Sequence, residues 1–239
     1  MRKSEHRPVR FWPRMRKIDM RITWYGHAAF LIESNGMRVI LDPYRSPDCG
    51  GYEPIDEPAE VVVLSHENDR YHSHLGQIVP PFEVIRALEM PMEGAEFKGI
   101  RFEAIHVFED SRRLPEDEVS IIHFKSEGIH IAFLGDLGHA LTDAEIAPIK
   151  GADIVIIAAG GPPTIDFPEI PTLLEAIDPR IVIPMHYLTP KINLKIQPFE
   201  SFQACLPGVP VDRPGTSSIE ISREIFTVQM RIVRLEHAR

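Results

Sequence analysis

The chain has few cysteines, no long apolar run and little positive charge, and each shortage excludes a class of protein. Its two cysteines, Cys49 and Cys205, lie far apart among 239 residues, which excludes a dense disulfide framework and a Cys-x-x-Cys zinc motif. No apolar run approaches the roughly 20 residues that span a bilayer. We therefore expect a soluble protein of the reducing cytoplasm, with no membrane partner.

Acidic residues outnumber basic ones by 35 to 26, and the formal net charge is -9. This balance argues against nucleic acid as a partner, because such binding needs clustered Lys and Arg facing the phosphates. The sequence also lacks a Gly-x-Ser-x-Gly nucleophile elbow, a Walker phosphate loop and a dinucleotide fingerprint. A small molecule is the expected ligand, and an oligomer stays possible.

The first 19 residues are basic and lack the apolar segment and cleavage site of a secretory signal. We interpret residues 1–19 as a peripheral or disordered arm, with a start codon placed too early as the alternative. Patterned sequence begins at Arg21, so residues 20–239 are expected to form a single domain.

Strand-like runs separated by turn signals dominate the chain. "RITWYG", "AAFLIES" and "MRVILDP" predict a β-meander, because Asn35-Gly36 between two of the runs is a strong hairpin signal. "EVVVLS" predicts a strand buried on both faces. Helices are expected at the Thr142 to Glu145 capping box, from Pro168 to Ile177 and from Pro198 to Leu206.

Polar residues follow several of these strands directly. His66 ends one strand, Asp136 a second and His186 a third, and Gly160-Gly161 ends another. Ligands of layered α/β proteins bind outside the carboxyl ends of strands, so these places are expected to converge on one crevice. Imidazole and carboxylate groups together are good ligands for Zn, Mn or Fe.

The run "ITWYGHAAFLIE…RVILDP…VVVLSH…FLGDLGH…IPMHY" resembles the metallo-β-lactamase fold, in its branch of lactonase-like and phosphoesterase-like hydrolases. The likeness covers roughly residues 20 to 226. It implies an αββα sandwich with mixed sheets flanked by helices, two metal ions at one edge, and a bridging hydroxide that attacks an ester, lactone or phosphodiester.

The family's HxHxDH signature, placed on this chain from His66, is largely replaced. Its second histidine falls on Asn68, its aspartate on Arg70 and its last histidine on Tyr71. The family's next histidine falls near Glu109, with His106 as a competitor. Asp136 matches the bridging aspartate, and His186 matches the final histidine.

The resemblance thus implies two unequal metal positions. The first keeps His66, Asn68, Glu109 or His106, and Asp136, all of which can bind a metal. The second would need Arg70, whose guanidinium repels a cation, so we expect it to be lost. The Arg70 charge is expected to fill that space and pair with Asp136, or to orient an anionic substrate.

Other histidines remain open to two interpretations. His27, in "YGHAAF", is either a site residue or a structural one, and His139 is either a supporting residue or a proton donor. His72 and His74 are interpreted as solvated loop residues, against the alternative of replacement ligands. His123 and His130 are expected on a sheet face, and Asp42 is expected to support the metal loop.

These observations predict a metal-dependent hydrolase that acts on a small ester, lactone or phosphoester through a metal-bound water. The centre is expected to hold one divalent ion or none, with Zn favoured over Mn or Fe. The alternative is an inactive family member that serves as a small-molecule binding or interaction module.

Overall fold

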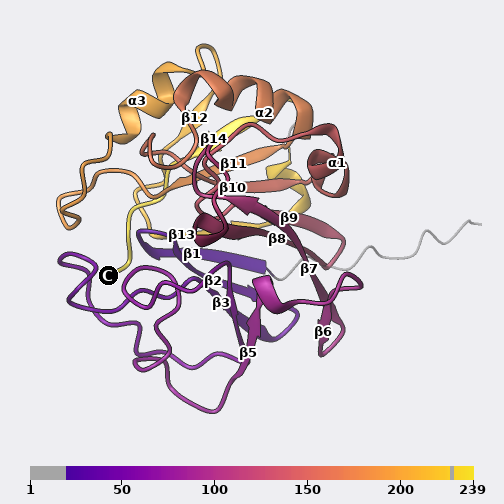
Figure 1. Ribbon diagram of the computed structural model, residues 1–239, viewed down its shortest axis with the longest axis vertical. Helices are drawn as coiled ribbons and strands as arrows, with labels where there is room; N and C mark the ends of the chain where they lie inside the picture. Colours follow the sequence, from indigo (N-terminus) through magenta and orange to yellow (C-terminus); the bar gives the residue numbers. More distant parts are fainter. Residues whose placement is uncertain (1–19, 227–228) are drawn as a thin grey trace, which may run out of the picture.

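The computed structural model describes residues 20–226 and 229–239, which form two packed β-sheets with helices on one outer face (Figure 1). The predicted arm, residues 1–19, lies outside the described residues. Large side chains from both sheets fill the space between them, including Trp24, Phe30, Phe102 and Phe133, each at most 1% exposed. No helix in the described part of the chain is long and apolar enough to cross a membrane.

The six-stranded sheet contains the predicted meander. Its order is β13 (Ser218–Ile221), β1 (Met20–Gly26), β2 (Ala29–Ser34), β3 (Met37–Leu41), β4 (Val61–Leu64) and β5 (Glu83–Arg86). Asn35 and Gly36 both have positive φ, 52° and 72°, as the predicted hairpin turn requires. Strand β4 is wholly buried between parallel neighbours β3 and β5, which confirms the interpretation of "EVVVLS".

The eight-stranded sheet is mixed. Its order is β12 (Val211–Asp212), β14 (Arg231–Val233), β11 (Ile181–Met185), β10 (Ile154–Ala158), β9 (Ile129–Phe133), β8 (Glu118–Ser126), β7 (Ile100–Phe108) and β6 (Ala95–Phe97). Strands β9, β10, β11 and β14 run parallel, so their carboxyl ends meet at one edge of the sheet.

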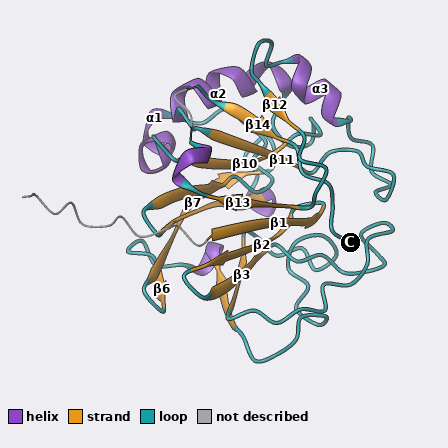
Figure 2. Cartoon of the chain, turned by 180° about the vertical axis from the view of Figure 1, so that it is seen from behind, coloured by secondary structure: helices purple, strands orange, loops and turns teal. Residues whose placement is uncertain are grey.

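The three predicted helices are present and cover the outer face of the eight-stranded sheet (Figures 1 and 2). They are α1 (Asp143–Ile146), α2 (Ile170–Ile177) and α3 (Phe199–Ala204). The Thr142 hydroxyl accepts a bond from the Glu145 N–H, and the Glu145 carboxylate accepts one from the Thr142 N–H. This is the capping box that the sequence predicts.

The outer face of the six-stranded sheet is covered by two long loops, residues 42–60 and 65–82, in the described chain (Figure 2). Their side chains Tyr44, Tyr52 and Ile78 pack with Leu31 and Ile40 of the sheet into a second apolar cluster. The sandwich confirms the predicted fold class, with loops in place of one helical layer. These loops also carry several residues of the site.

Candidate metal centre

Four imidazoles and one carboxylate meet where the strands of the two sheets end. His66 follows β4, Asp136 follows β9, His186 follows β11, and His27 lies in the turn between β1 and β2. These side chains and His72 of the loop after β4 are all buried, with 1 to 7% of each residue exposed. The predicted convergence of His66, Asp136 and His186 is therefore observed, and two further histidines join them.

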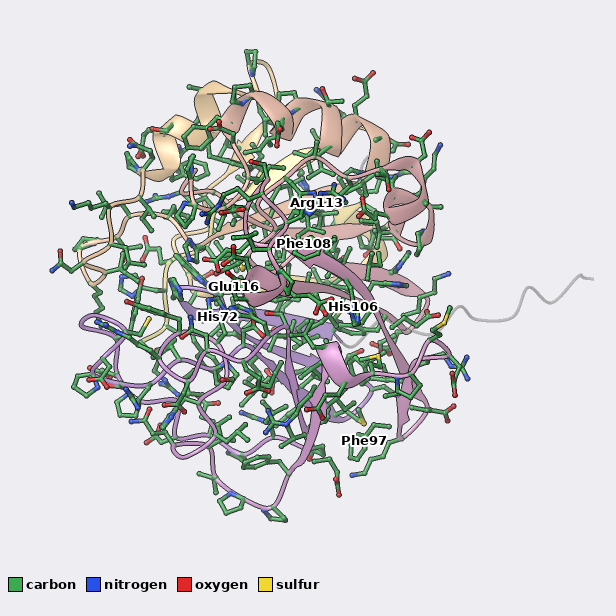
Figure 3. All side chains as sticks on the ribbon, in the orientation of Figure 1. His72, Phe97, His106, Phe108, Arg113 and Glu116 are labelled. Carbon is green, nitrogen blue, oxygen red and sulfur yellow. The ribbon has the colours of Figure 1, made fainter. Side chains whose placement is uncertain are left out.

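Two sets of side chains have ligand atoms within 4.8 Å of one another. One set is His27, His72 and His186, and the other is Asp42, His66 and His72. His72 belongs to both sets, so it lies at the middle of the group. Figure 3 labels His72 in the interior between the loops and the sheets.

His72 is held between two buried aspartates. Its Nδ1–H donates to Asp42 over 3.0 Å, and its Nε2–H donates to Asp136 over 2.9 Å. Burial by itself lowers the pKa of the His72 imidazole, but the charges of the two aspartates and the hydrogen bonds to them raise that pKa to about 10. In the metal-free protein His72 is an imidazolium that joins two carboxylates, and its interpretation as a solvated loop residue is wrong.

A tight turn in the loop explains this position. The His72 N–H donates to the Asn68 carbonyl four residues earlier, over 2.8 Å, and the N–H groups of Tyr71 and Ser73 converge on the same oxygen. The turn points the His72 ring inward and leaves Tyr71 half-buried beside His27, at 5.3 Å between ring centroids. The ring that the loop brings to Asp136 is therefore that of His72 and not that of Tyr71.

Arg70 does not pair with Asp136. Its side chain is exposed, donates from Nε to the Asp48 carbonyl over 2.8 Å, and lies over the Tyr71 ring at 5.0 Å. Because His72 fills the position beside Asp136, the predicted ion pair between Arg70 and Asp136 is not formed. The alternative prediction, an anion-orienting role for Arg70, stays open.

Neighbouring groups fix the tautomer of His66. The Ser65 hydroxyl donates to the Asp42 carboxylate over 2.5 Å, so its oxygen is left to accept from His66 Nδ1–H at 2.9 Å. The lone pair of His66 Nε2 then faces the site, where this buried atom has no partner. Burial and the charge of His72 lower the pKa of His66 to about 4, which keeps the ring neutral. Asp42 also accepts from the Ser65 N–H, as expected for a residue that supports the loop.

His27 and His186 lie ring against ring, with centroids 4.2 Å apart. Both nitrogens of His27 and Nδ1 of His186 are buried without a hydrogen-bond partner. Burial lowers the pKa of both imidazoles, that of His27 well below its usual value. Both rings are therefore neutral. The structure thus places His27 among the clustered imidazoles, and its role in the site stays a prediction.

Asp136 supplies the carboxylate that both His72 and His186 approach. Burial by itself raises its pKa, but the charge of His72 and the hydrogen bond from its ring bring that pKa well below the usual range. Oδ2 accepts from His72, and Oδ1 is buried without a partner. The carboxylate is thus ionised and keeps one oxygen free to bind a cation.

Glu109 lies beside this group, whereas His106 does not. The Glu109 carboxyl is half-buried, and its pKa is raised by burial and by the charge of Asp136. His106 is exposed on β7, where it pairs with Glu118 at 3.0 Å (Figure 3). By position Glu109 is the better candidate of the two, and its role as a ligand stays a prediction. Asn68 is half-buried, and its backbone carbonyl anchors the turn.

His139 is occupied by the backbone. Its Nδ1–H donates to the Ala140 carbonyl over 2.8 Å, and its Nε2 accepts from the Phe108 N–H over 3.1 Å. Nε2 thus joins the loop after β9 to β7, whereas Nδ1 lies beside Ala140 of its own loop and 3.1 Å from Arg113 Nη2. These contacts are those of a supporting residue, and the proton-donor alternative stays a prediction.

The donor set fits a divalent transition metal. Atoms of four residues are buried without partners in one small volume: both His27 nitrogens, His66 Nε2, His186 Nδ1 and Asp136 Oδ1. Such orphaned atoms are costly in a folded protein unless they serve a ligand. Neutral imidazoles with one carboxylate are ligands that zinc accepts.

Known proteins resemble this chain in sequence and in fold. The sequence model described as "Beta-lactamase superfamily domain" matches residues 21–186. A protein from Opitutus terrae named UPF0173 metal-dependent hydrolase is 27% identical, over 73% of this chain and 88% of its own length. A protein of the same name from Methanosarcina mazei is 28% identical, over 72% of this chain and 84% of its own length. A crystal structure of a metallo-β-lactamase superfamily protein from Thermotoga maritima aligns with a TM-score of 0.71 and 25% identity, covering 91% of this chain and 98% of that one.

Proposed function

Because this chain belongs to the family of the β-lactamase superfamily domain, we propose that it is a metal-dependent hydrolase acting on a small ester, lactone or phosphoester. The names of the relatives from Opitutus terrae and Methanosarcina mazei support a metal-dependent hydrolase. One observation carries the proposal: His27, His66 and His186 have buried ring nitrogens without partners, and the charge of Asp136 acts on all three rings.

The proposed centre takes one ion, with zinc favoured by the imidazole donors. Its ligands are drawn from His72, His186 and Asp136, with His27 and His66 beside them. A divalent cation there would lower the pKa of water and polarise the substrate oxygen. A second ion is disfavoured, because the remaining position offers His66 with only the Asn68 amide and the Glu109 carboxyl in place of further imidazoles.

The chain's own groups hold and move the protons. Asp136 stays ionised, and its Oδ1 is free to orient an attacking water. Glu109 has a raised pKa beside Asp136, so its carboxyl is the better group for passing a proton to the leaving group. Asp136 is buried away from bulk water, whereas Glu109 is half-buried at the side of the site.

His72 makes metal binding compete with protons. Its Nε2 carries a hydrogen that points to Asp136 in the metal-free protein, and a ligand nitrogen must release that hydrogen. Metal affinity is therefore expected to fall as the pH falls.

The position of His72 also favours a second function, that of an inactive family member that binds a small molecule. The imidazolium of His72 already satisfies Asp42 and Asp136, so the fold closes the centre by itself without a metal. An inactive member that binds a small molecule would keep this arrangement. Counting metal ions separates the two functions.

The test strips the purified protein with a chelator, reloads it with zinc, and counts ions per chain in wild type, His72→Ala and His74→Ala. We expect about one ion in wild type, no ion in His72→Ala, and wild-type content in His74→Ala, whose residue lies outside the centre. Phenyl acetate, a γ-lactone and bis(4-nitrophenyl) phosphate then serve as substrates for the loaded protein. Retention of no zinc by the wild type would leave the inactive binding module as the better account.

A further inference from the structure

A cavity of approximately 340 Å³ lies next to the metal centre. Three loops line it: Pro47, Asp48 and Gly50 before β4, Arg70 and Tyr71 after β4, and Ile192, Asn193 and Leu194 between β11 and α3. This volume is near the lower end of the range for small-molecule sites. The cavity therefore suits a compact ligand.

Tyr71 connects the cavity to the centre. Its ring packs against His27 at 5.3 Å on one side, and the Arg70 guanidinium lies 5.0 Å from its centroid. The guanidinium is thus no more than about 10 Å from the His27 ring. This separation is within the length of a small substrate.

Arg70 is the uncompensated charge of this cavity. Its Nε is bonded to the Asp48 carbonyl, but among the described residues no carboxylate lies within 4.0 Å of its guanidinium nitrogens. The Asp48 carboxylate is instead paired with Arg45 at 2.6 Å, and Arg45 also holds Asp69. The two terminal nitrogens of Arg70 are therefore left to bind an anion from the cavity, and a guanidinium keeps its charge at every relevant pH.

The walls are fixed before a ligand arrives. The Gly51 N–H donates to the Lys191 carbonyl over 2.6 Å, and the Tyr52 and Thr189 hydroxyls are bonded at 2.7 Å. A Cβ at Gly50 would lie 2.2 Å from the Lys191 oxygen, so only glycine allows the two loops to approach this closely. A preformed site loses less entropy when it binds.

We propose that Arg70 and this cavity form the subsite for an anionic group of the substrate, a carboxylate or a phosphate, with Ile192 and Leu194 contacting a small apolar part. The inference rests on the proposed function and narrows its substrate to an ester or lactone that carries a negative charge. Arg70 acts as a binding and specificity residue. Two parallel N–H···O bonds from its terminal nitrogens suit either anion.

Calorimetric titration of the metal-free protein tests the subsite with three probes: phenyl phosphate, phenylacetate and neutral benzyl alcohol. Wild type is expected to bind at least one anion more tightly than benzyl alcohol, and the stronger of the two identifies the anion. Arg70→Gln is expected to weaken anion binding roughly tenfold or more and to leave benzyl alcohol unchanged. Arg70→Lys should recover part of the loss, because it keeps the charge without the paired donors.

Arg86→Gln is the matched control, because Arg86 is also surface-placed and pairs with Glu67 away from the cavity. Equal anion affinity in wild type and Arg70→Gln would overturn the inference, as would failure of both anions to bind wild type. Anion binding by a protein that retains no zinc would instead contradict only the proposed hydrolase. Zinc-dependent hydrolysis with no Arg70 effect would contradict only the subsite.

Discussion

Two groups of buried histidines differ in what their ring nitrogens contact. His123 and His130 lie on the face of the eight-stranded sheet, where His130 Nε2 is 3.4 Å from His123 Nδ1 and Glu103 lies 3.9 Å from the same nitrogen. At the strand ends, by contrast, both ring nitrogens of His27 and Nδ1 of His186 are buried without a hydrogen-bond partner. Burial lowers the pKa of all four rings. The two groups thus share burial and a lowered pKa, and they differ in the unpartnered nitrogens that lie near Asp136.

Among the buried histidines, replacement of His72 is expected to change the stability most. Replacing it by Phe leaves Asp42 and Asp136 buried without their shared cation, so the free energy of unfolding of the metal-free protein should fall by about 3–5 kcal/mol. His130→Phe, on the sheet face, removes no charge partner and should cost far less. Urea denaturation measures both variants. If both variants lost the same free energy of unfolding, the pairing of His72 with Asp42 and Asp136 would contribute nothing beyond packing.

A smaller change in stability is expected when the pH is varied. His72 has a folded pKa of about 10, above its unfolded value, so its contribution is complete below pH ~6.5 and is lost as the pH rises toward 10. His66 has a folded pKa of about 4, so its contribution is complete above pH ~6.5 and is lost as the pH falls. His27 and His186 change in the same direction as His66.

The Tm of the metal-free protein should therefore be highest near pH ~6.5 and should fall on both sides. Thermal melts in chelator at acidic, neutral and alkaline pH test this profile. In His72→Phe the alkaline decrease due to this residue should disappear. A wild-type Tm that keeps rising into the alkaline range would exclude a charged His72 in the fold.

The smallest change in stability is expected at His27. His27→Leu removes two buried, unpartnered nitrogens, so the metal-free protein should be as stable as wild type or more stable. Zinc affinity, measured by competition with a chelator, should nevertheless fall by roughly tenfold or more, as for other groups that support a metal site. His130→Leu should leave zinc affinity unchanged. Unchanged affinity in His27→Leu would return this residue to a structural role.

The sequence predicted the parts of the fold that depend on local pattern. Asn35-Gly36 and the Thr142 capping box act within a few residues, and the apolar run of β4 specifies its burial by itself. The convergence of His66, Asp136 and His186 followed because strand ends in layered sheets share an edge. Strand β5, short and partly exposed, gave no comparable pattern.

The loop after β4 could not be predicted in the same way. Three N–H groups converging on the Asn68 carbonyl decide that His72 points inward and Arg70 outward, and no periodicity encodes such a turn. The partner that holds His72 is Asp42, which lies 30 residues away in sequence. The sequence did contain a usable signal. His72 lies one position beyond Tyr71, and it matches the last histidine of the signature if the loop is one residue longer.

A crystal structure of the zinc-loaded protein, with anomalous scattering recorded at the zinc edge, tests the central claim most directly. The account predicts one strong peak at about 2.0–2.1 Å from His72 Nε2 and bound to Asp136, with His72 still donating to Asp42. A map without a peak in this centre at saturating zinc, with His72 still joining the two carboxylates, would contradict it.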